Sequence, residues 1–423
     1  MPRLAHALIV VLVALTVRTA FQRSAEAYPR LEMIRNALDD QVLYVTWAAA
    51  LAQGAAMDWA DTGHEFAYWA PRWPGVHPQD PGYVYALAAV FRAAGFAFDA
   101  IRALQAALGA GTALLAWTLA RRHVGPGAAL AAGVAAALYQ PLVFYEATLL
   151  REPLATFLCA AALVACSAAE AGATRRRAVL AALGAGLLLG LAVLVRSHLA
   201  LPAAAIAAWL LVSTRRRLGA GVALALAFAA ALPVLPVVAG NVARSGRPAF
   251  VSSAGPYNLF IGNVHDGGGA ASPHYHAVKA QGPPQAVDLL AALRDDVAAH
   301  PGAFAARLVD KVRVLLGPAE VPDNLSVAMG RRLAGALKVA VVTDAVLLPA
   351  ALVGMALAGA AWRRHALLYV YALGYAASVV PFVVVSRLRQ PLLPVLAVFA
   401  ALALQQIVAW ARARRTRWRA ALA

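Results

Sequence analysis

The sequence predicts an all-α membrane protein that crosses the bilayer about ten times. Hydrophobic residues make up 62% of the 423 residues, and charged residues only 13%. The apolar residues form repeated long runs, each long enough to span the hydrocarbon core as a helix. Such runs must be helical because lipid offers the backbone no hydrogen-bond partner. The charges lie mainly between the runs, and their placement predicts the topology.

The first predicted span covers Leu4 to Phe21, and we expect it to be retained because no small-residue cleavage site follows it. Nine further spans are predicted at 101–120, 126–144, 153–171, 178–195, 197–213, 219–240, 340–362, 366–385 and 390–411. A shorter apolar stretch, Tyr83 to Phe98, carries Arg92 and is predicted to lie on the surface or to re-enter the membrane. Residues 1–423 are expected to form one membrane domain.

Arginine clusters in the short segments between spans contribute much of the net charge of +17. The clusters are Arg121-Arg122, Arg175-Arg176-Arg177, Arg215-Arg216-Arg217, Arg363-Arg364 and the tail 412–423. Ten spans place all of them on the cytoplasmic side, as the positive-inside rule requires, whereas an eleventh span at Tyr83 to Phe98 would reverse every later loop. The clusters form no basic face, so the bilayer is an expected partner and nucleic acid is not.

This topology leaves two large extracytoplasmic regions, 22–100 and 241–339, and short outer turns at 145–152, 196 and 386–389. We expect amphipathic helices over Gln41 to Gln53 in the first region and over about 285–299 and 302–316 in the second. Gly and Asn are dense between Asn241 and Asn263, which predicts a loop with tight turns. Ionisable residues are therefore expected in loops rather than along spans, which disfavours an ion-coupled transporter.

Neither a metal nor another cofactor is expected. Cys159 and Cys166 lie in one apolar run and are predicted to be buried and free. Four polar residues of the first loop, Asp58, Asp61, His64 and Glu65, lie near one another in the sequence. Their spacing fits no standard ligand set, so solvated loop polarity is the preferred interpretation.

Carboxylates of the outer regions are the candidate catalytic groups. Asp39 and Asp40 stand at the start of the first amphipathic helix, where one can cap the helix while the other faces a substrate as a general base. Asp80 lies between two prolines that hold its backbone extended, and is either catalytic or a plain turn residue. Glu152, beside Arg151, either anchors the membrane interface or shares a site with Asp40.

Arginines of the outer turns are candidate ligands for an anion. Arg387 and Arg389 lie in a very short outer turn, where positive-inside statistics disfavour them. A phosphate in the headgroup layer would explain them, since the planar guanidinium suits it; snorkelling to lipid headgroups is the alternative. Arg196 and His198, in another outer turn, are weaker candidates of the same kind.

Taken in order, these motifs resemble those of the GT-C membrane glycosyltransferases, in the branch of protein O-mannosyltransferases and lipid A aminoarabinose transferases. Asp40 and Tyr44 match the spacing of the family's first-loop acidic motif, and Asp39 is the alternative if the motif is an acidic pair. The stretches 79–83, 149–154, 258–263 and 387–391 resemble its Pro-Tyr element, second acidic motif, long-loop segment and basic turn. By this resemblance Tyr44, Tyr83, Asn258 and Asn263 belong to the substrate loops.

The resemblance implies transfer of one sugar from a polyprenyl-phosphate donor to a lipid, glycan or protein acceptor. Asp40, or Asp39, would take the proton from the acceptor hydroxyl, with Asp80 and Glu152 as further catalytic candidates. Arg387 and Arg389, with Arg196, would stabilise the phosphate leaving group. Direct displacement would invert the anomeric carbon. The expected location is the bacterial inner membrane, with the site on the periplasmic or external side.

Two other functions fit the sequence less well. A lipid-linked-oligosaccharide polymerase or ligase is usually organised around one large outer loop late in the chain, whereas two acidic outer motifs lie early here. A transporter or flippase should carry polar groups along its helices.

Overall fold

The computed structural model describes residues 2–26, 40–55, 75–266, 277, 286–323 and 326–422. Helices and short turns make up this part of the chain, and no strand is present in it apart from one isolated bridge between Tyr139 and Val342. The predicted all-α class is therefore confirmed. Asp39 and the polar group 58–65 lie outside the described residues.

The helices are listed here in chain order, with η for a 3-10 helix. They are α1 (Pro2–Glu26), α2 (Asp40–Ala52), α4 (Gly82–Ala94), α5 (Phe98–Ala120), α6 (Pro126–Ala137), α7 (Gln140–Glu146), α8 (Glu152–Glu170), α9 (Arg175–Val195), η3 (Ser197–Leu199), α10 (Ala200–Leu218), α11 (Gly221–Ser245), α12 (Ala254–Asn263), α14 (Ala286–Ala299), α15 (Pro301–Leu316), α16 (Val327–Leu333), η5 (Gly335–Val339), α17 (Asp344–Ala358), η6 (Gly359–His365), α18 (Ala366–Val379), η7 (Ser386–Leu392) and α19 (Leu393–Leu422).

In the described part of the chain, 8 helical segments are long and apolar enough to cross a membrane. They are Arg3–Ser24, Phe98–Ala120, Glu152–Glu170, Arg175–Val195, Ser197–Leu218, Gly221–Ser245, Asp344–Val379 and Ser386–Arg417. The difference from ten has two sources. The predicted spans 340–362 and 366–385 fall in one helical segment, and the predicted span 126–144 is divided between α6 and α7. The chain leaves helical geometry there because the Gln140 amide donates to the Val342 carbonyl instead of to α6.

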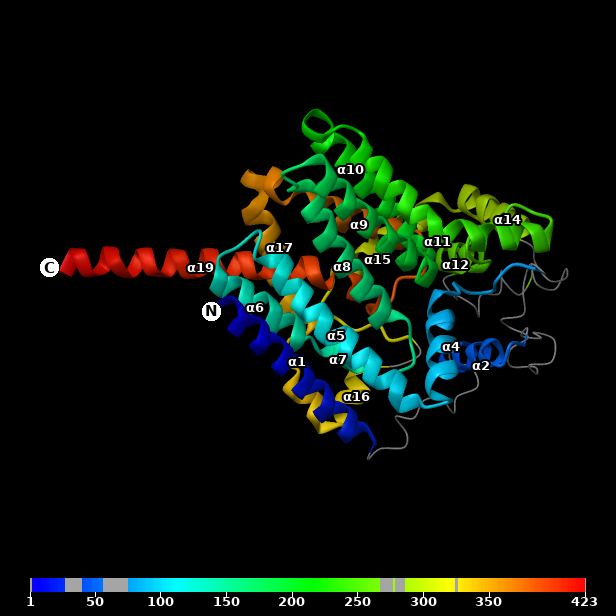
Figure 1. Cartoon of the computed structure of the whole chain (residues 1–423), viewed down its shortest axis with the longest axis horizontal. Coiled ribbons are helices and arrows are strands. Elements are labelled where there is room, and N and C mark those ends of the chain that lie inside the picture. Colours follow the sequence, from blue (N-terminus) through cyan, green and yellow to red (C-terminus); the bar gives the residue numbers. More distant parts are fainter. Residues whose placement is uncertain are drawn as a thin grey trace.

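Small residues let the central helices approach closely. Figure 1 shows α5, α8, α9 and α11 together in the body of the bundle. Gly186 and Gly190 of α9 lie against backbone carbonyls of α11, where an added Cβ would meet an oxygen at 2.2 and 2.3 Å. Close backbone approach of this kind is how helices gain packing energy in lipid. Cys159 and Cys166 are buried in α8 and form no disulfide, as predicted.

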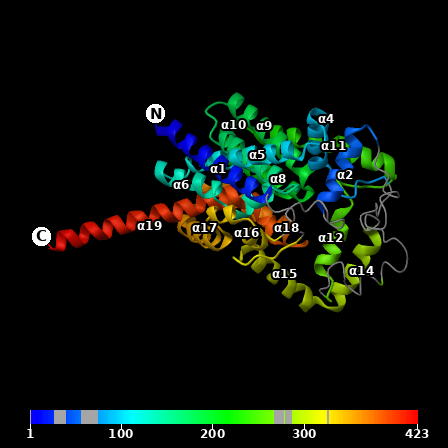
Figure 2. The same cartoon turned by 90° about the horizontal axis from the view of Figure 1, so that it is seen from below.

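The loops that carry the arginine clusters meet at one end of the bundle. His123 and His365 approach at 3.0 Å between their Nδ1 atoms, and Gln405 accepts a hydrogen bond from the amide of Gly125 at 2.6 Å. Both chain termini lie toward this end, and α19 projects beyond the bundle there (Figures 1 and 2). Termini at one end are what an even number of membrane crossings requires.

The helices of the two predicted outer regions lie at the other end of the bundle, where α2, α4, α12 and α14 gather (Figures 1 and 2). Helices α2, α14 and α15 coincide with the three predicted amphipathic helices to within one residue or two. Helix α2 is more buried than predicted, because Asp40, Gln41, Tyr44 and Trp47 all face other parts of the protein. Helix α4 lies beside α2, and at Gly82–Ala94 it is shorter than the stretch from Tyr83 to Phe98 predicted to lie on the surface or to re-enter the membrane.

We expect Gly354→Ala to destabilise the packing of α17 on α19. A Cβ at Gly354 would stand 1.8 Å from the carbonyl oxygen of Phe399, so the two helices must separate. Overpacking of this kind costs about 1–3 kcal/mol, and the unfolding temperature of the protein in detergent should fall accordingly. Gly184→Ala in α9 is the matched control, because among the described residues nothing lies within 4 Å of its added Cβ. An unchanged unfolding temperature for Gly354→Ala would contradict this account.

Candidate functional site

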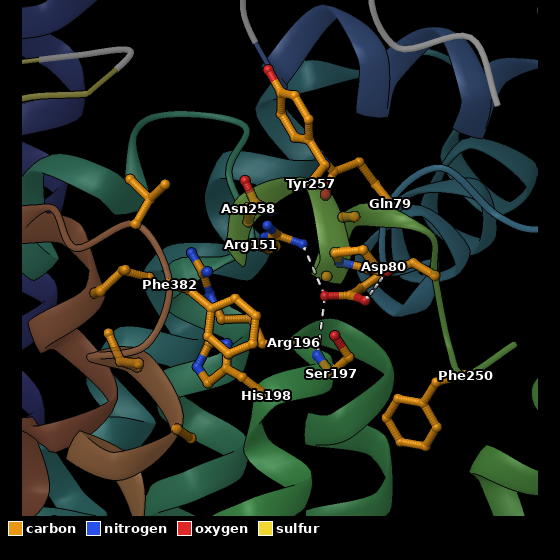
Figure 3. Close-up of a pocket in the computed structure, with 18 of the residues that line it drawn as sticks. Gln79, Asp80, Arg151, Arg196, Ser197, His198, Phe250, Tyr257, Asn258 and Phe382 are labelled. Atoms are coloured by element: carbon orange, nitrogen blue, oxygen red, sulfur yellow. Dashed lines mark hydrogen bonds and ion pairs between the residues drawn. The ribbon is translucent and has the colours of Figure 1, made fainter. Parts of the chain in front are cut away.

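A cavity of about 610 Å³ opens where the predicted outer motifs meet. Each motif supplies a charged side chain to its wall from the end of a helix. Asp40 begins α2, Asp80 precedes α4, Arg151 precedes α8, Arg196 follows α9, and Arg387 lies in η7. These residues are far apart in the sequence, and the fold brings them together around one cavity. Figure 3 shows three of them, Asp80, Arg151 and Arg196.

Asp80 is the point at which three segments are joined. Its carboxylate accepts hydrogen bonds from the Ser252 hydroxyl at 2.7 Å and from the Ser197 backbone amide at 3.0 Å. Arg151 forms an ion pair with it at 3.3 Å, and Figure 3 shows the contacts to Arg151 and Ser197 as dashed lines. Asp80 is only 6% exposed. With this many partners it fixes the cavity wall, which the plain-turn alternative does not explain.

Arg387 lies at the centre of a second ionic cluster. Its guanidinium contacts the carboxylates of Asp40 at 2.8 Å, Asp323 at 2.5 Å and Glu152 at 3.5 Å. Glu152 is fully buried and also contacts Arg196 directly. Asp40 and Glu152 therefore both contact Arg387. Glu152 does not line the cavity itself, but it pairs with two arginines that do, Arg196 and Arg387.

Several buried polar atoms of the cavity-lining residues have no hydrogen-bond partner among the described residues. They are Gln79 Oε1, Arg151 Nε, Arg196 Nε, His198 Nε2 and Arg387 Nη1. Buried polar groups are normally paired, so a group of unpaired ones around one cavity indicates a place for a polar ligand. Most of these atoms are donors on cationic groups, which favours an anion.

Burial and neighbouring charges keep the site's ionisation states fixed. Burial lowers the pKa of Arg151, but Tyr44, Asp80 and Asp40 outweigh it and hold that pKa above its usual value. For the Tyr44 phenol, burial is the largest effect, and it raises the pKa. At neutral pH the guanidinium is therefore charged and the phenol is neutral.

Apolar side chains complete the cavity wall. Phe250 comes from the segment before α12, Tyr257 and Ile261 from α12 itself, and Phe382 from the turn after α18 (Figure 3). Helix α18 ends a membrane-spanning segment, so this apolar wall is continuous with the bundle. A cavity lined by both guanidinium groups and hydrocarbon suits an amphiphilic ligand.

Of the four residues predicted for the substrate loops, Asn258 lines the cavity and the other three do not. Tyr44 and Tyr83 stack edge-on at 5.5 Å between ring centroids and join α2 to α4. Asn263 donates to the carbonyls of Leu259 and Pro381 at 2.6 Å. The structure thus places these three side chains in packing contacts.

Arg389 lies away from the cavity and is 1% exposed. Its guanidinium forms an ion pair with Asp344 at 2.6 Å and donates to backbone carbonyls of Leu315 and Ala319 at 3.2 and 2.9 Å. It also donates to the Val314 carbonyl. These contacts tie η7 to α15 and α17, so the two arginines predicted to act together have different surroundings.

A second cavity of about 570 Å³ lies next to the first. Glu320 and Ser386 line it, whereas Asp323 and Arg387 from the same two segments line the first cavity. Three cationic residues, Arg331, Arg332 and Lys338, also line the second cavity. Residues that are close in sequence, Arg387 next to Ser386 and Asp323 near Glu320, therefore line different cavities.

Sequence reasoning omitted some residues of the cavity wall from the candidate site. The sequence offers Arg151 only as a neighbour of Glu152 at the membrane interface, and Gln79 only as a neighbour of Asp80. Ser252 and Asp323 lie in loop segments rich in turn residues and carry no separate signal. Their hydrogen bonds and ion pairs arise from tertiary contacts that local sequence does not encode.

The comparisons with known proteins agree with this architecture. Residues 76–239, which carry Asp80, Arg151 and Arg196, match the family model described as dolichyl-phosphate-mannose-protein mannosyltransferase. A comparison with curated proteins gives no match.

Solved structures cover nearly the whole chain. The archaeal oligosaccharyltransferase AglB from Archaeoglobus fulgidus, in complex with an inhibitory peptide and a dolichol-phosphate, has a TM-score of 0.54 at 16% identity, covering 99% of this chain and 51% of that one. The apo form of the Archaeoglobus fulgidus oligosaccharyltransferase has a TM-score of 0.57 at 16% identity, covering 99% and 52%. ArnT from Cupriavidus metallidurans bound to undecaprenyl phosphate covers 94% of this chain and 77% of that one, at 17% identity and a TM-score of 0.43.

The chain shares its fold with the archaeal oligosaccharyltransferase, and the predicted resemblance to membrane glycosyltransferases is confirmed at that level. The mannosyltransferase family model matches only part of the chain. The chain spans about half the length of the oligosaccharyltransferase chains that it matches.

His77 holds the segment that leads to Asp80. Its carbonyl accepts a hydrogen bond from the Ser253 amide at 2.8 Å, and its ring lies 5.3 Å from the Trp47 ring. The Tyr85 hydroxyl approaches Nε2 at 3.3 Å. Burial, with help from Arg244, lowers the pKa of His77 to about 4, so the folded protein keeps the ring neutral.

We expect acid to destabilise the protein through His77. The unfolded chain protonates this ring below about pH 6.5, whereas the folded protein does not. The neutral His77 ring therefore makes its full contribution to the free energy of unfolding above about pH 6.5. That contribution, at most about 3 kcal/mol, is lost as the pH falls toward 4. Unfolding temperatures measured across this window should fall less steeply for His77→Gln than for the wild type. His6→Gln serves as the control, and equal slopes for all three proteins would refute the assignment.

Proposed function

We propose that this multi-pass membrane protein is an inverting glycosyltransferase. It moves one sugar from a polyprenyl-phosphate donor to a hydroxyl of a lipid, glycan or protein acceptor. The observation that carries the proposal is the main cavity, in which buried guanidinium groups with unpaired donors stand beside apolar walls at the end of a membrane bundle.

The donor phosphate binds beside Arg387 and Arg196 in this proposal. Both guanidinium groups are buried, so their interaction with a phosphate is weakly screened by water. Arg387 Nη1 and Arg196 Nε have hydrogen-bond donors to offer, and phosphate oxygens accept such bonds strongly. The polyprenyl chain lies along the apolar wall near Phe382, where the cavity meets a membrane-spanning segment.

Asp40 is the proposed general base. Its carboxylate lies in the cavity wall and is held by Arg387 at 2.8 Å. A donor phosphate competes with this carboxylate for the same guanidinium, so donor binding releases Asp40 to accept a proton. Asp80 and Glu152 instead position the wall. Both Asp80 oxygens accept hydrogen bonds from the protein's own donors, and Glu152 Oε1 pairs with Arg196 and Arg387.

The reaction is a single displacement. The acceptor oxygen forms a bond to the anomeric carbon as the bond from that carbon to the phosphate oxygen breaks, and the phosphate leaves with the electron pair. Asp40 takes the hydroxyl proton, and Arg387 and Arg196 stabilise the charge that grows on the phosphate. A donor in the first cavity and an acceptor in the second would meet beside the contact of Asp323 with Arg387.

We further propose that the site faces the periplasm or cell exterior of a bacterial inner membrane. The support is the charge distribution: the arginine clusters gather at the end of the bundle opposite the cavity, and positive loops favour the cytoplasm.

Asp40→Asn should lower donor consumption by about 10²–10⁴-fold, because the amide cannot accept the proton. The measurement is mass spectrometry of lipids from cells that lack the native protein and express the wild-type chain, the Asp40→Asn variant or neither. One polyprenyl-phosphate sugar should accumulate in the cells with the variant and in the cells with neither, but not in those with the wild-type chain. Asp99→Asn is the control, since this aspartate is exposed and pairs only locally with Arg102. If Asp40→Asn consumes donor like the wild type, the base is another residue. If no lipid-linked sugar changes in any strain, the glycosyltransferase proposal fails and transport becomes the better explanation.

Substituting the two arginines of η7 by lysine should have different effects. Arg387→Lys should lower turnover of that donor by about 10²–10³-fold while the protein stays folded, because one planar contact to the leaving group is lost. Arg389→Lys should instead lower the unfolding temperature, since lysine cannot reach Asp344 and the three carbonyls together. Turnover per folded molecule and thermal unfolding, measured on both variants, separate these effects. The opposite pattern would transfer the phosphate-binding role to Arg389.

A further inference from the structure

Three potential metal ligands meet outside the cavity. They are His265, two residues after α12, Asp296 in α14, and His300, directly after α14. Each offers one ligand atom, and these atoms all lie within 4.8 Å of one another. Two imidazoles and one carboxylate form a donor set that suits Zn²⁺ and related divalent transition metals.

The local fold explains why these residues meet. Asp296 and His300 are four residues apart, so they project from the same side of a helical turn. Helix α12 packs on α14 through a small apolar cluster of Tyr257, Phe260, Val264, Leu289 and Leu293. This packing places His265 over the end of α14. Arg307 of α15 then donates a hydrogen bond to the His265 carbonyl at 2.6 Å and fixes the backbone.

An ordinary hydrogen-bonded pair explains only part of this arrangement. Asp296 is buried and accepts from the His265 backbone amide at 2.9 Å, and its other oxygen contacts His265 Nδ1. That pair leaves His300 unexplained, although its ring stands edge-on to the His265 ring with centroids 4.1 Å apart. Two imidazoles so close would repel each other if both were protonated, whereas a cation bound between neutral rings draws them together.

We propose that His265, Asp296 and His300 bind one divalent transition-metal ion, with Zn²⁺ as the expected species. The metal replaces the proton shared by His265 and Asp296, which is released to solvent, and water takes the remaining coordination position. Tetrahedral zinc separates its ligand atoms by about 3–3.5 Å, within the span of this cluster.

The metal would fix the wall of the main cavity without taking part in the transfer. It joins the end of α12 to the end of α14, and α12 supplies Asn258 and Ile261 to that wall. The hydrogen bond from Arg307 extends the connection to α15. This inference does not depend on the glycosyltransferase proposal, since it concerns a separate group of ligands.

The test measures zinc in the full-length protein purified without a histidine tag. Each protein is stripped with a chelator, dialysed against Zn²⁺ and then against buffer, and its metal content is determined by mass spectrometry. We expect the wild type to retain one equivalent of Zn²⁺ more than Asp296→Asn, His265→Ala or His300→Ala. Zn²⁺ should also raise the unfolding temperature of the wild type but not of these variants.

Asp295→Asn is the matched control, because this neighbouring carboxylate is exposed and pairs with Arg294. It should retain the same zinc as the wild type. His300→Ala preserves the contacts between His265 and Asp296, so its fold can be verified by its unfolding temperature without metal. A wild type that retains no zinc, or a folded His300→Ala that retains as much as the wild type, would overturn the proposal.

Discussion

The ionic contact of Arg387 with three carboxylates is the interaction on which the candidate site depends. The contact joins Asp40 to Arg387, which lies 347 positions later in the sequence. It thereby links α2 of the first outer region to η7, which leads into the last spanning helix. A guanidinium buried at this depth is stable only with close counter-charges, and removing one partner exposes the others to the full penalty of burial. The relative positions of α2, α8 and η7 are therefore fixed by electrostatics as well as by packing.

Buried charges of this kind are poor contributors to stability compared with apolar side chains of the same size. Their position around a cavity is better explained by binding. The guanidinium of Arg387 is held in place before any ligand arrives, so little reorganisation is needed when a negative charge develops beside it. Asp80 provides the same preorganisation for Arg151, through the hydroxyl of Ser252 and the amide of Ser197. In this way Asp80 and Glu152 would determine how the arginines act in the proposed reaction without reacting themselves.

The sequence predicted the helical architecture and the convergence of its outer motifs, because both follow from properties that local sequence carries. Apolar runs set the helices, and arginine clusters set which ends lie together. It did not separate Arg387 from Arg389, since both share one signal, a positive charge in an outer turn. They differ because η7 has about three residues per turn, so side chains two positions apart point in different directions. Tyr44, Tyr83 and Asn263 were placed in substrate loops by resemblance, and tertiary packing determines their actual contacts.

The position of the cavity would satisfy two opposing requirements of the proposed donor. A sugar phosphate needs polar partners and exclusion of bulk water, whereas a polyprenyl chain needs an apolar surface that is continuous with the bilayer. The end of a helical bundle offers both, because the last turns of spanning helices are apolar while the turns that join them carry charge. Arg196 follows directly on the end of a spanning helix, and Phe382 lies just beyond α18. Charged and apolar groups can therefore face one ligand without an unpaired charge having to enter the lipid.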